Sequence, residues 1–210
     1  MYDGFFIAYF FANPYLMSKT SFNTPKKSIQ RLILVAVLVA CAFLLWPVLK
    51  QLGYQTGDEA TAERVYEWRK KLQLEALEKE NNLPRGLLSA VMHQESAGDP
   101  QAVSHAGAKG LFQFMAPTAR DMGLADRTNP DASARAAAKY IDQLYERYNK
   151  NIELTLAAYN WGLGNVDQYL KPRGKENKST YDKYRLTKMP DETQNYIARI
   201  KMLRTTYYLR

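Results

Sequence analysis

The sequence predicts an all-α domain that follows a single apolar segment near its N-terminus. Two observations support this fold class. Along the last 150 or so residues, apolar side chains recur every three or four positions, which is the spacing of amphipathic helices. No run alternates between apolar and polar residues as a half-buried strand does, and no segment repeats. With 210 residues in total, the chain is long enough for one domain with a sizeable core.

Residues 32–49 form an uninterrupted apolar run of eighteen residues, which is just long enough to cross a bilayer as a helix. Basic residues precede the run at Lys26, Lys27 and Arg31, whereas only Lys50 follows it closely. By the positive-inside rule, the N-terminus is then cytoplasmic and the domain lies outside. We therefore expect a cytoplasmic or unprocessed leader at residues 1–31, a single N-terminal transmembrane or signal helix at 32–49, a linker at 50–60 and the domain at 61–210.

Two other fates of the apolar segment stay open. It is also a candidate for a cleaved signal peptide, which would release the domain as a secreted protein. In addition, Leu38-Val39-Ala40-Cys41 resembles a bacterial lipoprotein processing box with Cys41 as the lipidated residue. The apolar run continues past Cys41, however, where a lipoprotein usually turns polar. We expect a retained inner-membrane anchor with the domain in the periplasm, and Met17 is an alternative start of the chain.

The first half of the domain is expected to hold two helices and a loop. Charged residues flank one apolar side at 61–79, which predicts a helix that Asn81 and Asn82 end. Pro84 suits the first turn of a second, short and apolar helix, and Gly98 suits its C-terminal cap. Three glycines and a proline between residues 98 and 110 predict a loop that lines the site.

The second half of the domain alternates helices with breakers. Gly123, Pro130 and Gly162 interrupt the helical pattern, and Asp131 is the expected N-cap of the longest helix. The polar and basic stretch at 171–188 is expected to be a loop. Helices are expected at residues 111–122, 131–148, 152–160, 166–170 and 190–209.

A carboxylate ends the apolar stripe of the short helix. Glu95 lies three and seven residues after Met92 and Leu88, so helical geometry places the three side chains on one face. Desolvation by apolar neighbours and the negative end of the helix dipole should both raise the pKa of Glu95. A carboxyl group that stays protonated near neutral pH can act as a general acid. For an isolated glutamate, a helix-capping or ion-paired role is the alternative.

Four blocks of the sequence carry further polar groups in a fixed order. They are Glu95-Ser96, Gly110-Leu111-Phe112-Gln113, Ala158-Tyr159-Asn160-Trp161-Gly162 and Glu192-Thr193-Gln194-Asn195-Tyr196. This order resembles the lytic transglycosylases of the soluble-lytic-transglycosylase (SLT) type, whose pattern is Glu-Ser, Gly-Leu-Met-Gln, Ala-Tyr-Asn-Ala-Gly and Glu-Thr-x-x-Tyr. The resemblance covers roughly residues 62–210, and four blocks at compatible spacing are a strong signal.

The resemblance implies a lysozyme-like fold and an exported enzyme that cuts peptidoglycan glycan strands without a cofactor. It implies that Glu95 protonates the glycosidic oxygen between N-acetylmuramic acid and N-acetylglucosamine. Glu95 then accepts the proton of the muramoyl 6-hydroxyl as this group attacks C1, which leaves a 1,6-anhydro sugar. The substrate-binding residues that the matching positions imply are Ser104, Gln113, Met115, Tyr159, Asn160, Glu192 and Tyr196.

Two departures and two other functions stay open. Phe112 replaces the common Met and Trp161 the usual Ala, which puts the preference for particular sugar subsites in doubt. A goose-type, lysozyme-like muramidase would hydrolyse the same bond, ordinarily with a second acid. Asp99, Asp121 and Glu192 are available, but none lies in a block that resembles a nucleophile site. A non-catalytic glycan-binding domain of an envelope assembly is the third possibility.

Composition excludes several classes of site. The net charge of +8 is shared about equally between the first fifty residues and the rest, so the domain is only mildly basic and carries no nucleic-acid recognition motif. Cys41 is the single cysteine, so no intramolecular disulfide can form. His93 and His105 alone cannot make a structural zinc site, and we expect no metal. The expected partners are peptidoglycan glycan strands and, through residues 32–49, the membrane.

Overall fold

A computed structural model describes residues 32–33, 35–37, 44, 57–171 and 188–209 of the chain. The chain divides into two units, residues 1–60 and 61–210, and each is considered by itself. Among the described residues, no helix has both the length and the apolar character to cross a membrane. Most of the expected anchor and linker, and the expected loop at 171–188 except its ends, lie outside the described residues.

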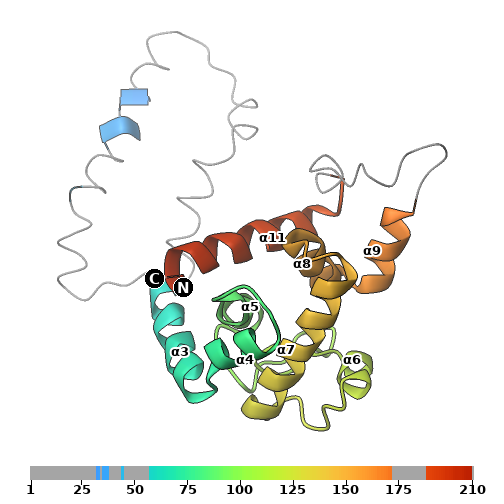
Figure 1. Ribbon diagram of the computed structural model, residues 1–210. Helices are drawn as coiled ribbons and strands as arrows, with labels where there is room; N and C mark the ends of the chain where they lie inside the picture. Colours follow the sequence, from blue (N-terminus) through green and yellow to red (C-terminus); the bar gives the residue numbers. More distant parts are fainter. Residues whose placement is uncertain (1–31, 34, 38–43, 45–56, 172–187, 210) are drawn as a thin grey trace. The chain divides into compact units, whose positions relative to one another are not determined.

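The second unit is helical, which confirms the predicted all-α fold for the part of the chain that is described (Figure 1). Two isolated antiparallel bridges, which join Lys109 to Val103 and to Phe114, tie the loop that follows the Glu95 helix. The helices are α3 (Gly57–Lys71), α4 (Leu74–Glu80), α5 (Leu87–Ser96), α6 (Ala116–Asp121), α7 (Pro130–Arg147), α8 (Ile152–Trp161), α9 (Leu163–Leu170) and α11 (Asp191–Leu203), followed by a π-helical turn, η2 (Arg204–Tyr208).

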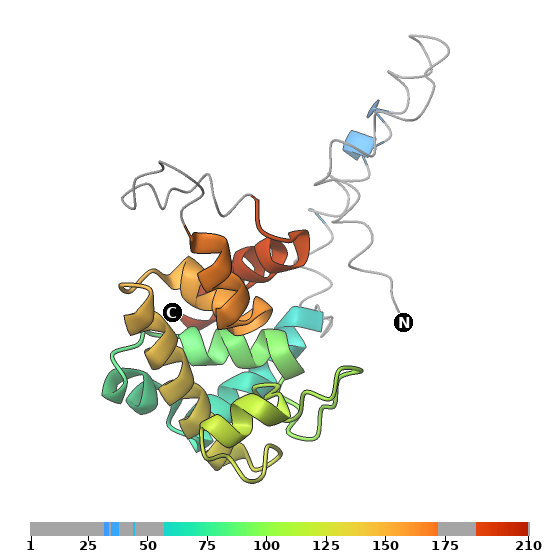
Figure 2. The same cartoon turned by 90° about the vertical axis from the view of Figure 1, so that its right-hand side faces the viewer.

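The short helix α5 is the centre of the domain. It packs against α4, α7, α11 and η2, and Figures 1 and 2 show it enclosed by the other helices. Its first seven residues are all buried, which explains why this segment is mostly apolar on all of its sides, with Ser89 and His93 as its buried polar residues. The last turn of α5 carries Glu95 and is more exposed. The most enclosed helix of the domain therefore presents a carboxylate at its open end.

A buried acid fixes the start of α5. The two carboxyl oxygens of Glu78 accept hydrogen bonds from the backbone N–H groups of Gly86 (2.7 Å) and Leu88 (2.8 Å). These are amides that a helix leaves without an intrahelical partner. Glu78 is 2% exposed, and its burial raises its pKa. At the other end of α5, Ala97 takes the left-handed cap conformation (φ 51°), one residue before the expected Gly98.

The π-helical turn η2 closes over the opposite side of α5. The Tyr208 hydroxyl and Nδ1 of His93 are hydrogen-bonded at 2.7 Å, and the Tyr208 carbonyl accepts a bond from the Arg69 guanidinium at 3.1 Å. A Cβ at Gly86 would lie 2.8 Å from the Tyr208 carbonyl oxygen, so this approach requires glycine. The C-terminal turn thus holds both the beginning and the middle of α5.

Several predicted helix boundaries are wrong. The first helix begins at Gly57, inside the expected linker, α9 begins at Leu163 and not at 166, and the last helix gives way to the π-helical turn after Leu203. The helix expected at 61–79 is two helices, because Gln73 takes a left-handed conformation (φ 51°) between α3 and α4. The helix expected at 111–122 begins only at Ala116. Pro117 is the physical reason, because a proline in a helix interior has no N–H to donate and would leave the Gln113 carbonyl without its partner. The N-cap of α7 is Asn129, which accepts from the Ala132 N–H, and not Asp131.

Candidate active site

Glu95 lies half-buried in the last turn of α5. Its Oε1 accepts a hydrogen bond of 2.5 Å from the hydroxyl of Tyr196 on α11. Burial raises the pKa of Glu95 from its ordinary 4.5 to about 7, and the bond from Tyr196 opposes this rise. The direction and the desolvation cause agree with the prediction from sequence. A substantial fraction of the carboxyl groups is therefore protonated near neutral pH, as general acid catalysis requires.

A second tyrosine faces the same carboxyl group. The hydroxyl of Tyr159, on α8, donates to the carbonyl oxygen of Phe112 at 2.7 Å. Burial raises the pKa of Tyr159 well above 10, and the negative charge of Glu95 raises it further. Burial and Glu95 act on Tyr196 in the same way. Both phenols thus stay protonated, and the structure brings together three of the residues that the sequence singled out, from α5, α8 and α11.

The loop between α5 and α6 is tied to this cluster at one end. Ser96 donates from its hydroxyl to the Leu111 carbonyl at 2.9 Å, next to the Phe112 carbonyl that Tyr159 binds. Within the loop, Gln113 has a left-handed backbone (φ 48°), and its Nε2 donates to the carbonyls of Ala102 (3.1 Å) and Gly110 (2.9 Å). The amide oxygen of Gln113 is the part left for a ligand.

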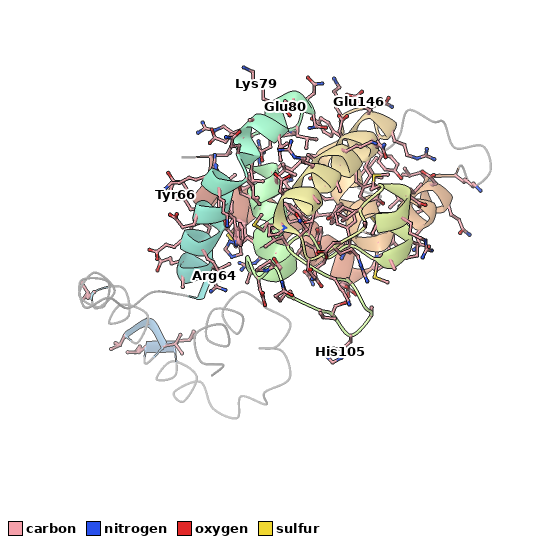
Figure 3. The ribbon with its side chains drawn as sticks, turned by 90° about the horizontal axis from the view of Figure 1, so that it is seen from below. Arg64, Tyr66, Lys79, Glu80, His105 and Glu146 are labelled. Atoms are coloured by element: carbon pink, nitrogen blue, oxygen red, sulfur yellow. The ribbon has the colours of Figure 1, made fainter. Side chains whose placement is uncertain are left out.

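Ser104 also makes a hydrogen bond inside the loop. Its Oγ accepts a bond of 3.0 Å from the Ala108 N–H, so its hydroxyl hydrogen is what it can offer to a ligand. His105, the next residue, lies at the outer tip of the loop (Figure 3). The sequence placed Gln113 in a helix and Ser104 in a loop. The structure shows both as parts of one folded loop whose own bonds orient them.

Arg127 anchors the other side of this loop. Its Nη1 donates to the carbonyls of Gly107 (2.8 Å) and Phe114 (2.9 Å). A Cβ at Gly110 would lie 1.9 Å from the Arg127 carbonyl oxygen, so the two backbones are in direct contact. No pattern in the sequence indicates this role for Arg127, because a single arginine in a polar segment normally indicates a solvated surface.

A family model for the transglycosylase SLT domain matches residues 73–182, which is just over half of the chain. The chain belongs to the transglycosylase SLT domain family. The resemblance seen in the four sequence blocks is thereby confirmed. The SLT domain model ends before α11, so the Tyr196 partner of Glu95 lies beyond the matched residues.

Two relatives of this chain are named membrane-bound lytic murein transglycosylases. The membrane-bound lytic murein transglycosylase F of Alcanivorax borkumensis is 44% identical over 87 residues, which cover 39% of this chain and 19% of that protein. The membrane-bound lytic murein transglycosylase F 1 of Alkalilimnicola ehrlichii is 35% identical over 120 residues, covering 54% of this chain and 24% of that protein. The chain thus matches only about a fifth to a quarter of the length of these relatives.

Solved structures show the same fold for the SLT domain. An inactive mutant of the lytic transglycosylase Slt from Pseudomonas aeruginosa is 30% identical with a TM-score of 0.53, over 64% of this chain and 23% of that chain. The 70 kDa soluble lytic transglycosylase of Escherichia coli is 23% identical with a TM-score of 0.56, over 66% of this chain and 24% of that chain. At this identity the second likeness shows the fold alone, and it supports the predicted lysozyme-like architecture.

The remaining predicted site residues lie on α8, at the start of α6 and on α11. Asn160 is half-buried, and its Oδ1 accepts a 3.0 Å bond from the hydroxyl of Thr193 on α11. Met115 is 42% exposed at the start of α6, and Glu192 is exposed in the first turn of α11. Sugar contacts by these side chains stay predictions. Thr193 was missed as a candidate because a threonine near a helix start is usually read as a cap.

Proposed function

We propose that the domain is a peptidoglycan lytic transglycosylase that cleaves the β-1,4 bond from N-acetylmuramic acid to N-acetylglucosamine and leaves a 1,6-anhydromuramoyl end. The observation that carries this proposal is the half-buried Glu95 carboxyl group, with a pKa of about 7 and a 2.5 Å bond from Tyr196. Membership of the SLT family and the names of the relatives support the same reaction.

In the proposed reaction, Glu95 acts twice. The protonated carboxyl group gives its proton to the glycosidic oxygen as the bond from that oxygen to C1 of the muramoyl unit breaks. The resulting carboxylate then accepts the proton of the muramoyl 6-hydroxyl as its oxygen forms a bond to C1. The proton count closes and no water is consumed. Because Tyr196 donates to Oε1, it stabilises the carboxylate between the two steps.

The electrostatics of Glu95 favour a mechanism with one acid. Glycosidases that hydrolyse normally place a second carboxyl group about 5–9.5 Å from the first. Burial and the bond from Tyr196 set the pKa of Glu95, and no second acid lies in a sequence block that resembles a nucleophile site. An internal hydroxyl nucleophile needs no second acid to activate it, which supports the anhydro product over hydrolysis.

We also propose that residues 32–49 anchor the chain in the inner membrane with the domain in the periplasm. The support is the apolar run itself, its basic flank at Lys26, Lys27 and Arg31, and the membrane-bound relatives. Peptidoglycan is then the partner of the domain, and lipidation at Cys41 and release of the domain are the competing outcomes.

The test of the reaction is Glu95→Gln with mass spectrometry of digested peptidoglycan. Gln is nearly isosteric but can neither give nor take the proton, so activity should fall at least roughly 10²–10⁴-fold. The matched control is Glu80→Gln, an exposed glutamate at the end of α4 that lies on the outer surface (Figure 3), and this variant should keep full activity.

The product separates the candidate functions. A 1,6-anhydromuramoyl end is lighter by one water than a hydrolysed end. Reducing muramic acid ends that incorporate oxygen from ¹⁸O-labelled water would instead identify a lysozyme-like muramidase. A well-folded wild-type chain that binds glycan strands but releases no fragment would identify a non-catalytic binding domain.

A further inference from the structure

We infer that Thr193 is a positioning residue, which acts through Asn160 to hold Tyr159 and Tyr196 in place at Glu95. The inference rests on the proposed function and concerns the same site. In this inference Asn160 links two helices, whereas the sequence suggested that it contacts the substrate.

The contact that carries the inference joins two helices. Thr193, in the first turn of α11, is 1% exposed, and its hydroxyl donates to Oδ1 of Asn160 in the last turn of α8 at 3.0 Å. The two residues are 33 positions apart in the chain. A hydroxyl buried without a partner costs free energy, so the packing of α8 against α11 is more stable in the arrangement that makes this bond.

Each end of the bond is next to a tyrosine of the cluster. Tyr159 directly precedes Asn160 on α8. Tyr196 follows Thr193 by three residues on α11, so the two side chains lie on the same face of that helix. The hydroxyl of Tyr196 reaches Glu95 at 2.5 Å, and the pKa of Tyr159 responds to the charge of Glu95. A shift at the Thr193 bond would therefore move both phenols relative to the carboxyl group.

Both helices end or begin at this place. α8 ends at Gly162, whose φ of 94° breaks the helix, and α11 begins after Pro190 without a side-chain cap bond. Helix ends fray more readily than helix interiors. The hydrogen bond from Tyr196 to Glu95 weakens as its length and angle depart from good geometry, and a displacement of about 1 Å can cost roughly 10²-fold in rate. Lys201 and Glu153 also join α11 to α8, but the bond between Thr193 and Asn160 is the one that lies next to both tyrosines.

The test compares two threonines in the full 210-residue chain. Thr193→Val removes the hydroxyl and keeps the shape, whereas Thr193→Ser keeps the hydroxyl. Thr155→Val is the matched control, because Thr155 is also buried but donates to Asn151 within its own helix at 2.8 Å. With a soluble, uncross-linked glycan strand, Thr193→Val should lower kcat about 10-fold at nearly unchanged KM, while Thr193→Ser and Thr155→Val should stay near wild type.

A second readout needs no catalysis. The bond from Tyr196 lowers the pKa of Glu95, so loosening that bond should raise it. NMR titration of the Glu95 carboxyl carbon should therefore give a higher pKa in Thr193→Val and in Tyr196→Phe, with no further rise in the double variant. Thr155→Val should leave the pKa where it is.

Two results would overturn the inference. One is a Thr193→Val variant that matches Thr155→Val in both kcat and the pKa of Glu95. The other is a loss of rate from Thr193→Val that is just as large when Tyr159 and Tyr196 are both replaced by Phe, because a residue that acts through these two phenols then has nothing left to position. If Thr193→Val does not fold, Asn160→Ala removes the same bond from the other side. A wild-type chain without cleavage defeats the proposed function, whereas the titration still decides the role of Thr193.

Discussion

Glu95 keeps a proton near neutral pH because its surroundings disfavour charge more strongly than Tyr196 favours it. Desolvation is the larger effect and the Tyr196 bond the smaller one, and together they leave the pKa at about 7. The sequence predicted this direction, since Leu88 and Met92 lie on the same helical face as the carboxyl group. The effect of the helix dipole, which was also expected to raise this pKa, stays a prediction.

Stability should report the same pKa. In the unfolded chain Glu95 titrates near 4.5, whereas in the folded domain it titrates near 7. Between these values the folded state binds more protons, so the free energy of unfolding should fall as pH rises through this window, by up to about 3 kcal/mol. Urea denaturation between about pH 5 and about pH 8 should show this slope in wild type relative to Glu95→Gln.

The difference in the free energy of unfolding between wild type and Glu95→Gln isolates the contribution of Glu95. Glu78 also has a raised pKa, but it is present in both and cancels. If the two unfolding free energies run parallel across this pH range, the carboxyl group of Glu95 is not buried in a way that favours its proton.

For single residues, the sequence predicts those with distinctive chemistry and misses those whose role depends on a hydrogen bond to a distant part of the chain. Glu95, Tyr159 and Tyr196 belong to recognisable blocks, and the structure brings them together. Thr193 donates a hydrogen bond to the side chain of Asn160. Arg127 donates to the backbone carbonyls of Gly107 and Phe114. Such partners are 13 to 33 residues away along the chain, where no periodic pattern reaches.

Among the elements, the loop between α5 and α6 differs most from expectation. Apolar residues at 111–115 were predicted to begin a helix, yet they form a folded loop in which Leu111, Phe112 and Phe114 are buried. Burial rather than helical geometry explains their apolar character, and a left-handed Gln113 separates them. A short apolar run does not by itself distinguish a helix from a buried loop.

Two glycines of this loop allow a controlled test of its packing. Gly110 and Gly107 both have left-handed backbones (φ 80° and 82°), but a Cβ at Gly110 would lie 1.9 Å from the Arg127 carbonyl oxygen while Gly107 has nothing within 4 Å. Gly107→Ala should cost about 1 kcal/mol for the conformation alone. Gly110→Ala should cost at least about 2 kcal/mol more, because backbone must move.

Urea denaturation of the two variants measures this difference, and binding of glycan strands shows whether Gln113 and Ser104 are displaced with the loop. Equal costs for the two substitutions would mean that the loop shifts away from Arg127 without effect, and that it is less rigid than its bonds indicate.

At the scale of the whole molecule, the sequence predicts the class of fold well because helical periodicity and breakers are local signals. The order of helices followed from them, whereas the enclosure of α5 by η2 did not. That contact joins His93 to Tyr208 across 115 residues, and local patterns contain no information at such a distance.

The proposed topology can be tested with alkaline phosphatase, which folds only where its disulfides can form. A fusion after Lys50 should be active and a fusion after Lys27 inactive, because residues 32–49 would carry only the first across the membrane. Globomycin should leave the mass of the mature protein unchanged. An inactive fusion after Lys50 at normal expression would reverse the orientation, and a larger precursor under globomycin would establish Cys41 as a lipidation site.

The long-range hydrogen bonds of α5 also determine the order in which parts of the domain can form during synthesis. A growing chain completes Glu95 101 residues before Tyr196 and His93 115 residues before Tyr208. At ordinary rates of synthesis this delay is on the order of 10 s. During that time the apolar surface of α5 lacks its covering turn and the carboxyl group of Glu95 lacks its phenol partner. We therefore expect a partly made chain to expose apolar surface until its last helix is in place.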